Sequence, residues 1–132
     1  MYSAASAYSR TQKQTANPRE LESQLLLRAG ARIQAIVDGT TTDPAEILDA
    51  LNYNRRLWSI LLAAVLEPDN ALPREVRENF ANLAIFVVSQ TKALELNPDV
   101  AKMPMLVRFC RDIAQGLRSV TAAEPTASAE VA

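Results

Sequence analysis

The sequence predicts an all-α protein, an antiparallel four-helix bundle built as a single domain over residues 1–120. Two observations point to this fold. Prolines preceded by capping residues mark helix starts, and apolar residues then recur at alternating steps of three and four. No segment alternates with the period of two that is typical of strands. A chain of 132 residues can bury one core, and connections of roughly five to eight residues favour antiparallel neighbours.

Helix starts and ends are marked in the sequence by residues that suit helix termini. Asn17 precedes Pro18 and Asp43 precedes Pro44, and in both pairs a capping side chain stands before a proline that fits the first helical position. Gly39 is predicted to end the first helix in the left-handed conformation. The predicted helices cover residues 18–38, 44–66, 73–96 and 104–120.

Each predicted helix has one apolar stripe with the spacing of a left-handed bundle. The residues predicted to form the core of the bundle are Asn54, Trp58, Leu61, Phe80, Leu83, Val87, Ile113 and Leu117. Asn54 is the exception among them, because a buried amide needs a hydrogen-bond partner. Gln90, in the stripe of the next helix, is the expected partner, and the pair would fix the register of the bundle.

A second apolar row lies beside the stripe of the 44–66 helix and is formed by Tyr53, Leu57, Ile60 and Ala64. Two interpretations remain open. Either a neighbouring helix covers this row, or the row borders a groove for the amphipathic helix of another protein. Under the second interpretation the row buries the partner helix, and Arg55 and Arg56 orient it at the rim.

The two ends of the chain are expected to lie outside the bundle. Residues 1–16, with Tyr2 and Tyr8, form a strap that is too short and polar to be an independent helix, so it must lie on the bundle to be ordered. We count both tyrosines as candidate partner-binding residues. Residues 121–132 lack large apolar side chains and are predicted to be a disordered tail.

The composition argues against catalysis and against cofactors or metals. The chain has no histidine, one cysteine and three dispersed glycines, so ligands for a metal and a phosphate-binding loop are lacking. Cys110 falls on the apolar stripe of the last helix, where we expect a small buried residue. The sequence therefore predicts a protein that is not an enzyme and that works through its binding surfaces.

Charge and hydropathy indicate the compartment and the class of partner. The net charge is -1 and the basic residues are interleaved with acidic ones, so nucleic acid is not expected as a direct partner. The longest apolar run, Ile60 to Leu66, is too short to span a membrane. A single cysteine suits a reducing compartment, and the chain starts without a signal peptide, so we expect a cytoplasmic protein.

Three blocks of the sequence resemble the flagellar biosynthesis regulator FlaF of alphaproteobacteria. They are residues 8–27, Ala50 to Trp58 (ALNYNRRLW) and Leu72 to Phe86 (LPREVRENFANLAIF). The resemblance implies a small cytoplasmic factor for flagellin production and export that works alongside the regulator FlbT. A more general pattern, a tyrosine-containing strap followed by TxNPxEL, is similar to the flagellin chaperone FliS, a helical bundle.

The resemblance gives two hypotheses for function. In the first, the protein is a flagellin-binding secretion chaperone and regulator, which holds the terminal helices of flagellin on its surface. In the alternative, it regulates flagellin synthesis after transcription, acting through FlbT or flagellin mRNA without holding flagellin.

Overall fold

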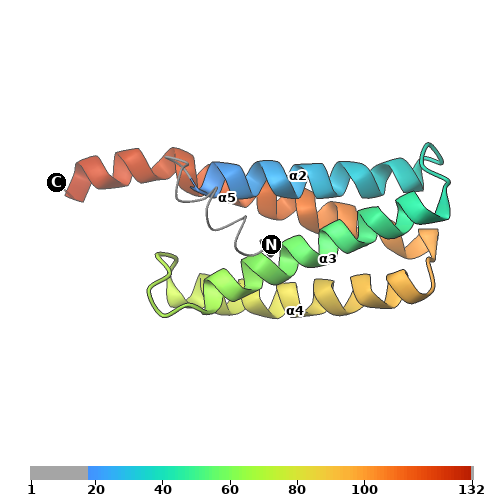
Figure 1. Ribbon diagram of the computed structural model, residues 1–132. Helices are drawn as coiled ribbons and strands as arrows, with labels where there is room; N and C mark the ends of the chain where they lie inside the picture. The colour runs from blue at the N-terminus through green and yellow to red at the C-terminus, as the bar shows by residue number, and fades with distance from the viewer. Residues whose placement is uncertain (1–17, 132) are drawn as a thin grey trace, which may run out of the picture.

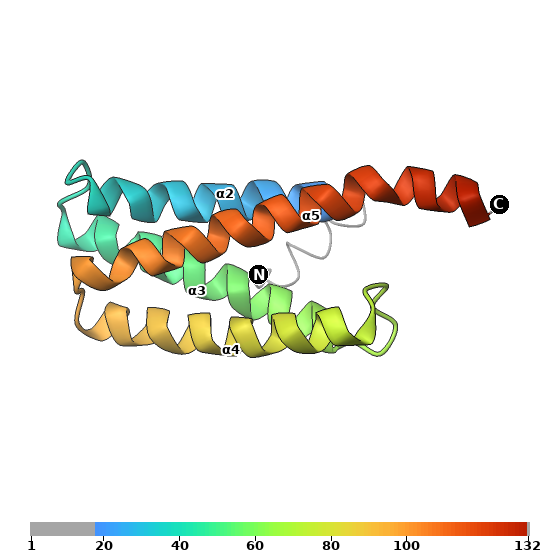
Figure 2. The ribbon, with the colours of Figure 1, turned by 180° about the vertical axis from the view of Figure 1, so that it is seen from behind.

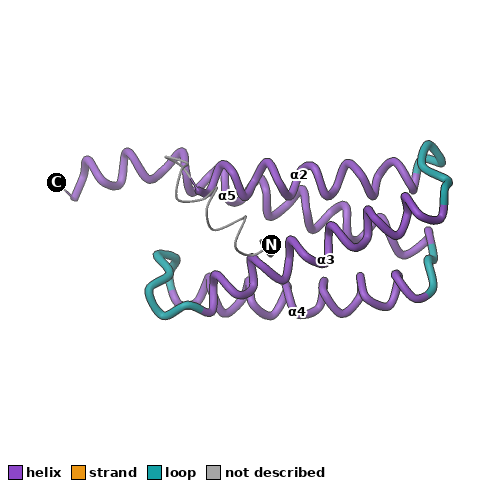
Figure 3. Tube along the Cα trace, viewed as in Figure 1, coloured by secondary structure: helices purple, strands orange, loops and turns teal. Residues whose placement is uncertain are grey.

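The computed structural model describes residues 18–131, with burial and side-chain contacts up to Ser119. This part of the chain contains four α-helices and no strand, so the predicted all-α bundle is confirmed (Figures 1 and 3). The strap predicted for residues 1–16, with Tyr2 and Tyr8, lies outside the described residues. The elements are α2 (Pro18–Val37), α3 (Pro44–Leu66), α4 (Arg74–Leu96), a 3₁₀ turn (Val100–Lys102) and α5 (Met103–Val131).

The turn between α2 and α3 has the end groups expected from the sequence. Gly39 adopts a φ of 79°, and its N–H donates to the Ile36 carbonyl at 3.1 Å. A left-handed glycine of this kind ends a helix at little steric cost. Asp43 then caps α3, because its carboxylate accepts a hydrogen bond from the Ala45 N–H at 3.1 Å.

The end of α5 differs from the prediction. The helix continues to Val131, whereas the sequence predicts a disordered tail from residue 121. The prediction of disorder rests on the lack of large apolar side chains in residues 121–132. Alanine and glutamate are nevertheless strong helix formers, and they account for seven of the twelve residues in this stretch.

The four helices associate as two close pairs. α2 packs along α5 and α3 packs along α4, while α2 and α3 join the pairs. α4 and α5 make far less contact with each other than the helices within either pair do. Figures 1 and 2 show that the pairs converge at the end with the 38–43 turn and separate toward the 67–73 loop. We refer to these as the closed end and the open end.

Small residues bring α2 and α5 together. A Cβ placed on Gly30 would lie 3.2 Å from the Cβ of Cys110, which is tighter than ordinary van der Waals contact. Toward the open end, the buried Ser23 hydroxyl donates to the Ala114 carbonyl at 2.9 Å. The close pairing of α2 and α5 therefore depends on small side chains at both positions.

No helix within residues 18–131 is sufficiently long and apolar to cross a membrane.

Candidate functional site

The second apolar row of α3 meets α2 at Tyr53 and is partly covered over the rest of its length. Leu57 is only 5% exposed and belongs to the core, with Tyr53 and Ile60 packed against it. The guanidinium of Arg32 on α2 lies 5.2 Å from the centre of the Tyr53 ring, in cation–π geometry. A neighbouring helix therefore covers this row at Tyr53, as in the first of the two interpretations, and the buried Leu57 is not available to a partner, while Ile60 and Ala64 remain half-buried.

The two arginines that follow Asn54 differ in their surroundings. The Arg55 Nε forms an ion pair and hydrogen bond with the Glu95 carboxylate, so it ties α3 to α4. Arg56 is exposed. Arg55 is therefore engaged within the bundle, and Arg56 faces solvent.

A buried polar layer joins α3, α4 and α5 near the closed end. The Asn54 Nδ2 donates to the Thr91 hydroxyl at 3.1 Å, and that hydroxyl donates to the Val87 carbonyl at 2.6 Å. The Cys110 thiol donates to the Asn54 Oδ1 at 3.3 Å. The amide partner on α4 is thus Thr91 and not the expected Gln90. Because unpaired buried polar groups are costly, the layer fixes the register of three helices.

Trp58 and Cys110 are both buried beside this layer. Burial raises the pKa of the Cys110 thiol to about 11, and the nearby Trp58 indole N–H lowers it by a smaller amount. That N–H has no partner in hydrogen-bonding geometry within the described part of the chain. The Trp58 ring stacks on Phe80, with 5.6 Å between centroids and 10° between planes. A neutral buried thiol of this kind is a packing residue and a poor nucleophile.

The apolar stripes of α4 and α5 become partly exposed toward the open end. Val87 and Cys110 are fully buried, but the next stripe residues on both helices are half-buried: Phe80, Leu83, Ile113 and Leu117. Phe86, which is 43% exposed, meets the half-buried Phe109 edge to face at 6.2 Å. We define the α4–α5 face as these partly exposed apolar residues: Phe80, Leu83, Phe86, Phe109, Ile113 and Leu117.

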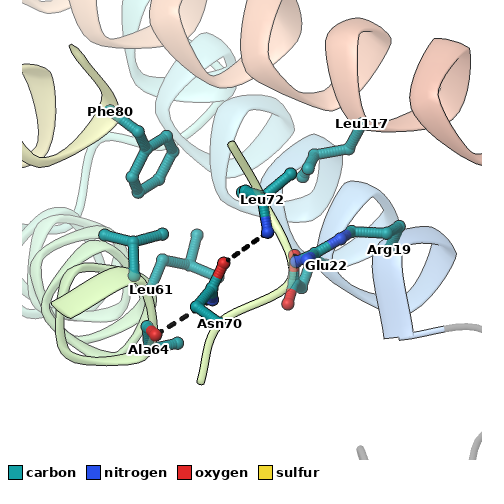
Figure 4. Close-up of a pocket in the computed structure, with 9 residues that line it drawn as sticks. Arg19, Glu22, Leu61, Ala64, Asn70, Leu72, Phe80 and Leu117 are labelled. Atoms are coloured by element: carbon teal, nitrogen blue, oxygen red, sulfur yellow. Dashed lines mark hydrogen bonds and ion pairs between the residues drawn. The ribbon is translucent and has the colours of Figure 1, made fainter. Parts of the chain in front are cut away.

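A pocket lies at the open end of the α4–α5 face (Figure 4). It is a small pocket that opens to solvent, and the space of about 300 Å³ between its lining residues includes solvent outside it. Its lining residues are Arg19, Glu22, Leu61, Ala64, Val65, Asn70, Leu72, Phe80 and Leu117. The Asn70 side chain shapes the rim, since its amide donates to the Ala64 carbonyl at 3.0 Å and its Oδ1 accepts from the Leu72 N–H at 3.0 Å.

The polar wall of this pocket was not predicted from the sequence. Glu22 is only 3% exposed, and its carboxylate lies 3.3 Å from the Arg19 guanidinium. The spacing of three residues on one helix is the signal that could have indicated this ion pair. The resulting site is an apolar face that ends in a pocket with one charged wall, a surface suited to apolar side chains of a protein partner.

No significant match was found among curated proteins or among solved structures. The family model described as flagellar protein FlaF matches residues 4–117, which include α2, α3, α4 and the part of α5 that carries the α4–α5 face. Since that match covers most of the chain, the protein belongs to the FlaF family of flagellar proteins.

Proposed function

We propose that this flagellar protein binds flagellin in the cytoplasm as a secretion chaperone and regulator of flagellin production. The observation that carries the proposal is the α4–α5 face, a set of apolar side chains left partly exposed by the separation of the two helix pairs. Family membership supplies the flagellar context. An amphipathic helix laid on such a face buries its own apolar stripe and covers the exposed residues.

The α4–α5 face suits this function better than the row predicted from the sequence. Leu57 belongs to the core and would have to leave it to meet a partner. Phe86 is exposed and the other residues of the α4–α5 face are half-buried without any such rearrangement. Holding the terminal helices of flagellin here would keep them from associating before export.

Two adjacent residues of α4 provide a matched test. Phe86 lies on the α4–α5 face, while Ile85 is 56% exposed on the outer side of the same helix. We expect wild-type protein and the Ile85→Asp variant to elute with monomeric flagellin in size-exclusion chromatography, and Phe86→Asp to lose the complex. A wild-type protein that elutes apart from flagellin would contradict the proposal.

The alternative, regulation through FlbT or flagellin mRNA, makes a different prediction. It requires a gel shift with flagellin mRNA or a complex with FlbT, in the absence of any complex with flagellin. Binding to RNA would weaken steeply as salt is raised. The chromatography and the gel shift, run on the same preparation, separate the two functions.

A further inference from the structure

Gly116 is a glycine that no contact within the described residues explains. It lies in the interior of α5, is exposed, and is not among the glycines with positive φ. A Cβ added there would meet no described atom within 4 Å. Glycine is disfavoured in a helix interior relative to alanine. Gly30 differs, because a Cβ at that position would press on Cys110.

The position of Gly116 links it to the α4–α5 face. It follows Ile113 by three residues and Phe109 by seven, so helical geometry places it on the side of α5 that carries both. Its neighbour Leu117 lines the open-end pocket. A glycine at this point removes the side chain that would otherwise hold another backbone away from α5.

We propose that Gly116 is the point of closest approach between α5 and an amphipathic helix of a partner, which lies along the α4–α5 face. This rests on the proposed function, in which the partner helix belongs to flagellin. Without a Cβ at Gly116, the axis of the partner helix can come nearer to α5, and its apolar residues reach Leu83 and Ile113 between the two helix pairs.

The length and the charge of the face define the partner helix further. From Phe109 to Leu117, the face extends along α5 for roughly 12 Å, or a little over two turns. The partner helix therefore supplies apolar residues at positions such as i, i+3 or i+4, and i+7. Glu75 lies three turns before Phe86 on the same side of α4 and is exposed, whereas on α5 the exposed Asp112 stands one turn after the exposed Arg108. The α4 side of the face is therefore the acidic one, and it favours basic residues on the side of the partner helix that lies toward α4.

The test uses three variants of the full chain and monomeric flagellin. Gly116→Ala should raise the melting temperature, because alanine is the better helix former, and yet weaken flagellin binding. Gly116→Leu should weaken binding by about tenfold or more, since its side chain occupies the contact. Gln115→Leu, on the adjacent exposed position that faces away, should bind as wild type does. Isothermal titration gives the affinities, and thermal melts followed by circular dichroism give the stabilities.

The outcomes separate this inference from the proposed function. Wild-type affinity in Gly116→Leu would overturn the inference and leave the proposed function standing. Absence of binding by the wild-type protein would overturn both. A lowered melting temperature for Gly116→Leu without flagellin would show that the chain's own residues occupy this position, and the inference would fail. Self-association of the wild type that Gly116→Leu abolishes, with flagellin binding unchanged, would assign the contact to a second copy instead.

Discussion

The closed and open halves of the bundle are built from the same helices and differ in how completely their apolar residues are covered. Near the closed end, α4 and α5 contribute residues that are almost fully buried: Val87, Thr91, Leu94, Met103, Leu106 and Cys110. Near the open end, the stripe residues of the same two helices are half-buried. Continuous helices with continuous stripes can thus form a closed core at one end and a binding surface at the other.

The difference between the halves has an identifiable cause. At the closed end, the bonds of Asn54 to Thr91 and Cys110 hold α3, α4 and α5 in one layer. Toward the open end, α5 remains packed on α2 and α4 remains packed on α3. The apolar stripes of α4 and α5 therefore no longer pack against each other. The open end thus has less packing between α4 and α5 and more accessible apolar surface. A chaperone that binds an amphipathic helix needs such a surface.

The largest effect should come from charging a residue of the closed core. In Leu57→Asp, a carboxylate enters the buried core, where it is shielded from water, and we expect a loss above about 4 kcal/mol that unfolds the protein. Ile85→Asp, on the exposed side of α4, should stay helical by circular dichroism. A folded Leu57→Asp variant that fails to bind flagellin would restore the α3 row as the binding surface.

Trp58 and Phe80 stack on each other, but the first ring is fully buried and the second is half-buried. Truncating each ring in turn compares packing in the two environments. Trp58→Ala should cost about 3–5 kcal/mol, because the ring is fully buried. Phe80→Ala should cost about 1–2 kcal/mol, because half-buried groups lose less contact. Urea denaturation followed by circular dichroism gives both values. Equal losses would mean that the open end is as tightly packed as the closed end.

The buried thiol makes the stability of the closed end depend on alkaline pH. The folded-state pKa of Cys110, about 11, lies above its ordinary value of 9.0, so the folded protein retains the proton more strongly. The free energy of unfolding should be unaffected below about pH 9 and fall by about 2–3 kcal/mol as the pH rises to 11. The Cys110→Ala variant serves as the reference, since all other titrating groups are common to both proteins. Parallel pH profiles for the two proteins would show that the thiol is not shielded.

The smallest effect concerns the partner of the buried amide. Thr91→Val preserves shape but leaves the Asn54 Nδ2 without its acceptor, and we expect a loss of about 1–2 kcal/mol. Gln90→Ala removes the residue that the sequence indicated and should change stability by less than about 0.5 kcal/mol. Chemical denaturation of the two variants decides between them, and a larger effect at Gln90 would mean that the amide turns toward that residue in solution.

Local signals in the sequence were sufficient for the helices themselves. Asp43 caps α3 and Gly39 ends α2 through bonds between near neighbours, so these boundaries follow from a few residues. The choice between Gln90 and Thr91 could not be made in this way. Gln90 lies in the apolar stripe of α4 and Thr91 directly follows it, and the actual partner depends on how α4 is rotated against α3.

The spacing of apolar residues could not predict the candidate site, because the site depends on how the two helix pairs separate. Phe80 and Leu117 continue the stripes of Val87 and Cys110, and nothing in the spacing distinguishes covered from uncovered positions. α2 adds a second difficulty, because its buried face includes Glu22 and Ser23. Polar residues of these types are usually exposed. They are buried here because Ser23 bonds to α5 and Glu22 pairs with Arg19.

The high pKa of Cys110 makes this chain well suited to chemical labelling. At pH 7 roughly one molecule in ten thousand carries the thiolate that reacts with maleimide dyes. A cysteine introduced at an exposed position outside the α4–α5 face, such as Ile85, would react far faster, with the native cysteine left in place. Dyes attached in pairs, on α4 and on α5, would then report by energy transfer whether the open end widens, stays fixed or closes when flagellin binds.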